Sequence, residues 1–183
     1  MNIQLTAIAG VVVIRTEAYE DERGAFARLY CERALADVLG ARRVVQINRS
    51  LTRKAGAIRG MHFQYAPHAE MKMIRCLKGR VWDVAVDIRA GSPTFLHWHA
   101  EELTPANAKM LVVPEGCAHG FQVLEEDSEL LYLHTAFYEP AAEGGLLYDD
   151  PRLSIAWPLP ATEISRRDRE HAAIAEDFAG MRL

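Results

Sequence analysis

The chain has 183 residues, of which 50% are apolar and 25% are charged, the balance of a soluble globular protein and most simply of one domain. Its formal net charge of −4 excludes the basic footprint of a nucleic-acid-binding protein. No apolar run approaches the roughly 20 residues that a membrane-spanning helix needs.

The first predicted element is a strand at the VVVI run, residues 11–14. The sequence around it has no positive n-region, so we expect no signal peptide. A helix is predicted at 31–40, because apolar residues recur at helical spacing and Gly40 can cap the C-terminus. A second helix is predicted from Ser165 to about Met181, where Ser165 and Asp168 match a capping box.

The chain between these helices is predicted to form short strands. In the clearest one, Val81 to Arg89, the even-numbered apolar residues fall on one face and Asp83 and Asp87 on the other. Many short strands separated by turn residues are typical of an all-β sandwich or barrel, and a jelly roll also removes exposed strand edges. The other strand-like runs are 42–49, 70–77, 95–103, 109–114, 119–125 and 129–138.

The three cysteines, Cys31, Cys76 and Cys117, form no CxxC pair and leave an odd number. We therefore expect no disulfide framework and a cytoplasmic location. Cys117 lies near His119 and could be a thiol nucleophile. A small buried residue is the stronger interpretation, because cysteine commonly behaves as a small hydrophobe.

His62 and Lys72 are the first candidates for chemistry. His62 follows Gly60, whose missing side chain permits close approach of a ligand, although a lone histidine in a strand is more often structural. Lys72 would share a strand face with Ile74 and Cys76. A lysine on an interior face is costly unless it is paired or functional. If Lys72 points outward instead, Arg75 becomes the buried charge.

Tyr132, His134 and Tyr138 share parity in the run LLYLHTAFYEP. A tyrosine can donate its phenol proton to a reactive carbon. Most strand tyrosines simply pack, and nothing local separates Tyr132 from Tyr138 as the acid.

A metal site is an alternative interpretation of this region, because PxGxxH at 114–119 matches half of a metal-binding cupin signature. Glu70 and His119 could be ligands, but the histidine pair expected in the other half is His62-Phe63-Gln64, and the Lys72 ammonium would repel a divalent cation. We expect no metal. His97 and His99 have no evident third ligand and are predicted to be exposed strand residues.

Several motifs occur in one order along nearly the whole chain: DERGAF at 21–26, QINRS at 46–50, IRGMHFQ at 58–64, KGRVWDVAVDIRAGSPTF at 78–95, PEGCAHGFQVL at 114–124, YDDP at 148–151 and IAWP at 155–158. Together they resemble the dTDP-4-dehydrorhamnose 3,5-epimerase family, a branch of the cupin superfamily. The resemblance implies a single cupin-type jelly-roll β-barrel domain over residues 1–183, with a few short helices including a C-terminal one. It also implies a homodimer that exchanges N-terminal strands.

The resemblance implies a role for four catalytic positions. His62 would remove the proton next to a 4-keto group, and Asp168 would hold and polarise that imidazole. From the residues alone, a helix cap is the stronger interpretation of Asp168. Lys72 would stabilise the enolate oxygen, and Tyr132 would return a proton from the opposite face.

Eight further positions match substrate contacts of that family. His119 would bond the sugar or its keto oxygen, and Tyr138 and Glu143 would close around the sugar. Arg23 and Phe26 would reach in from the partner subunit. The matching nucleotide and diphosphate contacts are Arg23, Phe26, Gln46, Asn48 and Arg59.

The implied activity is a cofactor-independent isomerase of deoxysugar biosynthesis that inverts carbons 3 and 5 of a dTDP-4-keto-6-deoxyhexose, on the route to rhamnose and cell-envelope carbohydrate. Its expected partner is a small-molecule nucleotide sugar, with no nucleic acid and no membrane. The chain shows no Gly-rich dinucleotide fingerprint.

Other functions remain open at this point: a single-site epimerase, a metal-dependent cupin, or a barrel that binds sugar nucleotides without catalysis. The chain departs from the family pattern at Arg28 and Glu70, which stand where a glutamate and a glutamine are common, and at one inserted residue near Leu51 and Thr52.

Overall fold

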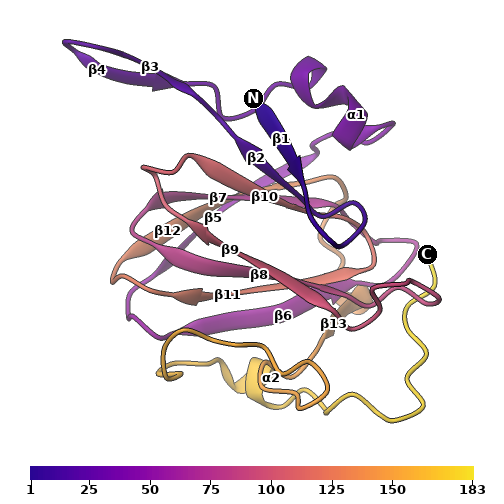
Figure 1. Ribbon diagram of the computed structural model, residues 1–183. Helices are drawn as coiled ribbons and strands as arrows, with labels where there is room; N and C mark the ends of the chain where they lie inside the picture. The colour runs from indigo at the N-terminus through magenta and orange to yellow at the C-terminus, as the bar shows by residue number, and fades with distance from the viewer.

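The computed structural model describes residues 1–183, and two antiparallel sheets face each other in it (Figure 1). The six-stranded sheet has the order β1 (Asn2–Leu5), β2 (Val12–Arg15), β10 (Lys109–Val113), β7 (Lys72–Lys78), β12 (Ser128–His134) and β5 (Gln46–Thr52). The five-stranded sheet has the order β13 (Glu143–Gly145), β6 (Ile58–Gln64), β11 (Cys117–Val123), β8 (Val81–Asp87) and β9 (Trp98–Leu103). Successive strands often change sheet, as β10, β11 and β12 do. The all-β jelly-roll prediction is confirmed.

The main core lies between the two sheets and takes inward-facing residues of β2, β7, β8, β9, β10, β11 and β12. On β7, Ile74 and Cys76 point into it, as the period-2 pattern predicts. Across from them, Ala85 and Phe121 supply the facing layer from the five-stranded sheet. Lys72 has the parity of Ile74 and therefore lies on the inner side, at one end of this core.

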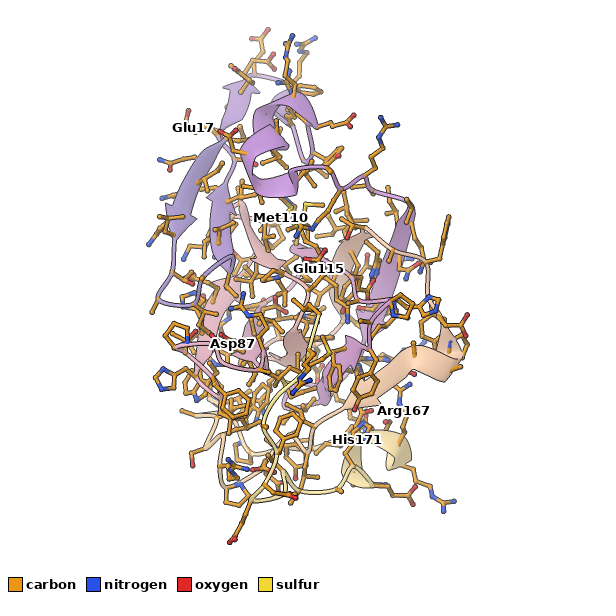
Figure 2. All side chains as sticks on the ribbon, turned by 90° about the vertical axis from the view of Figure 1, so that its right-hand side faces the viewer. Glu17, Asp87, Met110, Glu115, Arg167 and His171 are labelled. Carbon is orange, nitrogen blue, oxygen red and sulfur yellow. The ribbon has the colours of Figure 1, made fainter.

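The outer face of the six-stranded sheet is covered by a short helical segment, η1 (Arg33–Leu35) followed by α1 (Ala36–Leu39). This confirms the helix predicted near 31–40, and Gly40 ends it with a φ of 58° and an N–H donated to the carbonyl of Ala36. Leu35 and Leu39 are buried against the sheet with Met110, which lies in the middle of the molecule (Figure 2). No helix in the chain has the length and hydrophobicity needed to cross a membrane.

The outer face of the five-stranded sheet is covered by the C-terminal part of the chain, which runs along that side in Figure 1. It includes the short helix η2 (Pro140–Ala142) and α2 (Arg166–Arg169). Leu153, Ile155 and Met181 pack there against Val84 and Val86 of β8. Strand β8 is therefore buried on both faces.

The predicted helix from Ser165 to Met181 is much shorter in the structure, because α2 ends at Arg169. Ser165 does cap it, since its hydroxyl accepts a hydrogen bond from the Asp168 N–H at 3.1 Å. Beyond the helix, the N–H of Ile174 donates to Asp150 and that of Met181 to the carbonyl of Ile88. These contacts spread the tail over the sheet, and packing overrides its helix propensity.

A two-stranded hairpin, β3 (Ala18–Asp21) and β4 (Gly24–Ala27), projects away from the two sheets (Figure 1). Tyr19 and Phe26 on it are 78% and 74% exposed. Exposed aromatic rings on a projecting arm are typical of a surface that binds another molecule.

Candidate active site

A pocket of about 900 Å³ opens between the sheets and is lined by side chains from both of them. His62 enters it from β6, Lys72 from β7 and Tyr132 from β12. The structure thus brings three of the four candidate catalytic residues together through their strands. The fourth, Asp168, lines the same pocket from α2.

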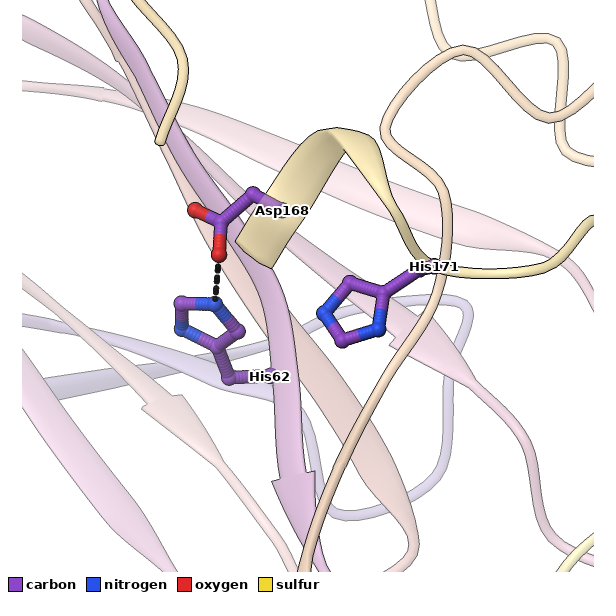
Figure 3. A group of neighbouring side chains, drawn as sticks. All are labelled: His62, Asp168 and His171. Atoms are coloured by element: carbon purple, nitrogen blue, oxygen red, sulfur yellow. Dashed lines mark hydrogen bonds and ion pairs between the residues drawn. The ribbon is translucent and has the colours of Figure 1, made fainter. Parts of the chain in front are cut away.

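His62 and Asp168 form a hydrogen-bonded dyad (Figure 3). Nε2 of His62 lies 2.9 Å from Oδ1 of Asp168, and the N–H of Gly60 donates to Oδ2 at 3.2 Å. Burial by itself would raise the pKa of Asp168, but these hydrogen bonds and the nearby imidazole outweigh burial and hold the pKa well below its ordinary value. A carboxylate that stays ionised accepts the Nε2 proton. Because the ring proton is then on Nε2, the other ring nitrogen, Nδ1, is unprotonated and can act as a base.

Gly60 does not leave room for a ligand, as its position before His62 suggested. It has a φ of 139°, and a Cβ there would meet the Cα of Gly120 on β11 at 2.5 Å. The space is filled by the neighbouring backbone, so Gly60 allows close approach of β6 and β11.

Tyr132 presents its phenol to the pocket between two histidines. Its ring lies edge-on to His119 and stacks on His134, each with centroids 6.0 Å apart, and its hydroxyl is 3.4 Å from that of Ser50. Burial raises the pKa of Tyr132 far above its ordinary value. The side chain therefore stays a neutral phenol, the form that can donate a proton.

His119 is held by a buried carboxylate that sequence reasoning missed. Nε2 of His119 lies 2.8 Å from Oδ1 of Asp83, whose side chain has no exposed surface. Burial raises the pKa of Asp83. In the sequence, Asp83 is one of the polar residues on one face of the run 81–89, and this was the available sign of a special role. Only the register of β8 with β11 shows that Asp83 lies beside His119.

Several of the predicted binding residues lie around the mouth of the same pocket. Asn48, Arg59, Tyr138 and Glu143 line it, and the Tyr138 hydroxyl donates to Glu143 at 2.9 Å. Gln46 lies beside them, with its side-chain oxygen accepting the Tyr138 N–H at 3.2 Å.

Arg167 is a pocket residue that sequence reasoning did not select. Its guanidinium donates to Glu143 at 2.8 Å and to Asp168 at 3.3 Å, and it remains 54% exposed. The available signal was the cluster of arginines around Asp168. A half-exposed guanidinium beside a pocket suits a phosphate group.

Arg23 and Phe26 lie outside this pocket. Both are on the projecting hairpin β3–β4, where Arg23 pairs with Asp21 at 2.6 Å. Neither side chain therefore contributes to the pocket of its own chain in this structure.

One cluster could offer three ligands to a metal ion: His62, Asp168 and His171, with ligand atoms within 4.8 Å of one another (Figure 3). Arg167 opposes this use, because its Nη2 lies 3.0 Å from Nε2 of His62 and brings a positive charge to the same atom. Figure 2 shows Arg167 and His171 at the same end of the molecule. Glu70 and His119, the possible metal ligands of the sequence, are bonded to His134 and Asp83 instead.

Comparisons with known proteins agree on one family. The family model described as dTDP-4-dehydrorhamnose 3,5-epimerase matches residues 5–176. The enzyme of that name from Salmonella typhimurium is 41% identical over 170 residues, covering 92% of this chain and 92% of that one. The crystal structure of the Elizabethkingia anophelis enzyme is similar with a TM-score of 0.91 at 36% identity, covering 97% and 98% of the two chains. A Legionella pneumophila epimerase, solved in complex with dTDP-4-keto-L-rhamnose, has a TM-score of 0.87 at 38% identity and covers 91% and 89%.

Proposed function

The chain belongs to the dTDP-4-dehydrorhamnose 3,5-epimerase family, and from this we propose that it converts dTDP-4-keto-6-deoxyglucose to dTDP-4-dehydrorhamnose by inverting carbons 3 and 5. The enzyme is an isomerase. The observation that carries the mechanism is that His62 with its Asp168 partner, Lys72 and Tyr132 all line one pocket.

We propose that the first step is proton removal by Nδ1 of His62. The C–H bond next to the ketone breaks, its electron pair forms the enolate double bond, and the negative charge moves to the ketone oxygen. Lys72, whose side chain is only 12% exposed, would stabilise that oxygen. Asp168 would stabilise the imidazolium that forms, at 2.9 Å from Nε2.

The second step is proton return by the Tyr132 phenol to the opposite face of the enolate. The hydroxyl O–H bond breaks as the new C–H bond forms. The phenolate then regains a proton from solvent, and the His62 imidazolium releases to solvent the proton that it took from the substrate, so both groups are reset before the next exchange. Since burial raises the pKa of Tyr132, the resting residue holds its proton until the still more basic enolate carbon takes it. Two such exchanges, at carbon 3 and carbon 5, give the product.

We propose that Arg59 and Arg167 bind the diphosphate, because their guanidinium groups line the pocket and can form bidentate hydrogen bonds. Asn48 and Gln46 would contact the nucleotide, and Tyr138 with Glu143 would enclose the sugar, as their position at the mouth suggests.

We further propose a homodimer in which the hairpin β3–β4 enters the partner's pocket. The hairpin leaves its own sheets, and Phe26 is 74% exposed on it. Arg23 would add a third guanidinium to the partner's diphosphate site. On this basis residues 1–183 form one catalytic domain, and the hairpin β3–β4 of the partner completes its active site.

A cytoplasmic location would suit the three cysteines, which are all free. Burial raises the pKa of Cys76 to about 11 and that of Cys117 to about 12, so neither thiol is a nucleophile at neutral pH. Cys117 thus has the properties of a small buried residue.

The test is solvent deuterium exchange into dTDP-4-keto-6-deoxyglucose, followed by proton NMR. The proposal requires deuterium at carbons 3 and 5 together with inversion. Exchange at carbon 3 alone would make the enzyme a single-site epimerase, and nucleotide binding without exchange would make it a binding protein. Elemental analysis of the same sample checks for a metal-dependent cupin.

A further inference from the structure

Glu70 and His134 form a buried polar pair beside Lys72 that the mechanism above does not use. Nδ1 of His134 lies 2.7 Å from Oε2 of Glu70. The two side chains are 11% and 7% exposed, and both line the pocket with Lys72. A charge this well buried in a site has to be explained by the groups around it.

The other carboxylate oxygen of Glu70 faces Lys72. Nζ lies 3.3 Å from Oε1 of Glu70 and 3.3 Å from the carbonyl oxygen of His62. An ammonium has three N–H donors. Two are directed at fixed oxygens on β6 and just before β7, so one donor is left for an oxygen inside the pocket.

The second ring nitrogen of His134 fixes which tautomer is present. Nε2 lies 3.3 Å from Nδ2 of Asn48, which is an amide nitrogen and can only donate. Nε2 is therefore the acceptor, and the ring proton is on Nδ1, where it donates to Glu70. The chain of contacts runs from Asn48 through His134 and Glu70 to Lys72.

We propose that Glu70 is a positioning residue that directs the Lys72 ammonium at the ketone oxygen, and that His134 holds Glu70 in place from β12. This inference rests on the proposed function. It explains how the site holds the positive charge of Lys72 in position. Burial alone would raise the pKa of Glu70, but His134 and Lys72 outweigh burial and lower it. Glu70 is thus an anion throughout the working pH range.

A carboxylate beside Lys72 has two opposing effects. Its charge weakens the attraction between Lys72 and an enolate oxygen, while its hydrogen bond fixes the direction of the ammonium. A donor that is already oriented needs no reorganisation when charge develops, and the proposal is that this gain exceeds the cost of the opposing charge. Part of the opposing charge is taken up by the hydrogen bond from His134.

The first experiment compares Glu70→Met, which keeps the length of the side chain but removes both carboxylate oxygens, with the wild-type enzyme, using NMR rates of epimerisation. We expect kcat to fall by about 10-fold to 10²-fold, up to the cost of losing an oxyanion donor, with KM within about threefold. A kcat equal to or above that of the wild type would overturn the proposal. Wild-type exchange is measured first, so a protein that exchanges at neither carbon refutes the proposed function and not this inference.

The second experiment uses two replacements of His134 that each keep one of its contacts. The amide of His134→Asn takes the place of Nδ1 and can still donate to Glu70. The amide of His134→Gln takes the place of Nε2 and keeps only the contact with Asn48. We expect His134→Asn to retain at least about 10 times the kcat of His134→Gln, and the reverse order contradicts the proposal.

The chain supplies a matched control in a second lysine–glutamate–histidine group outside the pocket. Glu101 on β9 lies 3.2 Å from His99 and 2.6 Å from Lys109. Glu101→Met removes an equivalent carboxylate and should leave kcat and KM at wild-type values. If Glu101→Met lowers kcat as much as Glu70→Met does, the effect is one of stability, and the positioning role is refuted.

Discussion

Oδ1 of Asp168 lies 2.9 Å from Nε2 of His62, although 106 positions separate the two residues in the chain. Strand β6 supplies the imidazole and the one-turn helix α2 supplies the carboxylate. Ser165 orders that turn by accepting the N–H of Asp168, which leaves the Asp168 side chain free for His62 and Gly60. The helix cap and the catalytic dyad are therefore compatible.

Asp168→Asn should lower kcat by about 10²-fold to 10⁴-fold, the range for loss of acid–base catalysis. The asparagine amide can donate to Nε2, which moves the ring proton to Nδ1 and removes the base. Epimerisation rates followed by NMR check this. Glu170→Gln, which removes an exposed carboxylate at the end of the same helix, should keep wild-type activity. If Glu170→Gln lowered kcat as much as Asp168→Asn does, the loss would come from disturbance of helix α2 and not from removal of the Asp168 carboxylate.

Tyr132→Phe should separate proton removal from inversion. The variant keeps the ring contacts with His119 and His134 but cannot return a proton to the opposite face. We expect inverted product to form about 10²-fold to 10⁴-fold more slowly, while deuterium still enters with retained configuration through His62. Tyr65→Phe, at a half-exposed tyrosine, serves as the control. Inversion at the wild-type rate would exclude Tyr132 as the acid.

The exchanged hairpin predicts complementation between two defective chains. Arg23→Ala and His62→Ala should each abolish most activity as homodimers. Co-expressed with different tags, they should recover about one quarter of wild-type activity, since half of the dimers are mixed and each mixed dimer has one intact site. If Arg23 served the pocket of its own chain, the mixture would recover nothing.

Asp87 predicts a pH-dependent contribution to stability. Burial would raise its pKa, but hydrogen bonds from Arg89, Ser92 and Thr94 outweigh burial and hold the pKa below that of an unfolded aspartate, about 3.9. Its stabilisation is therefore complete above about pH 4 and is lost as the pH falls through the folded-state pKa. Asp87→Asn should cost about 3 kcal/mol or more at pH 7, and the difference should shrink below about pH 4.

Denaturant unfolding of both proteins at several pH values measures this. Asp177→Asn, at an exposed aspartate, is the matched control and should leave the free energy of unfolding unchanged. A cost for Asp87→Asn that stays constant down to pH 2 would show that the charge of Asp87 is not responsible.

The sequence was sufficient for most of the central strands and for the inward face of β7. It did not predict β1, the hairpin β3–β4 or β13, and it placed β5 at 42–49 instead of Gln46–Thr52. Period 2 placed Lys72 with Ile74 and Cys76, and that placement is confirmed. It could not show that Glu70 meets His134 or that Asp83 meets His119, because those pairs depend on the register between strands far apart in the chain. The helix predicted to Met181 was wrong in extent, because local propensity carries no information about the sheet that the tail covers.

The tail that covers the five-stranded sheet also carries Asp168. The last strand of the two sheets ends at Gly145, so the chain supplies every strand, including the one that carries His62, before it supplies the carboxylate of Asp168. Docking of the tail therefore buries the apolar outer face of the five-stranded sheet and brings the carboxylate to His62 in the same event. A protomer whose tail has come loose would lose turnover before it lost its sheets, so activity is a more sensitive reporter of tail undocking than circular dichroism.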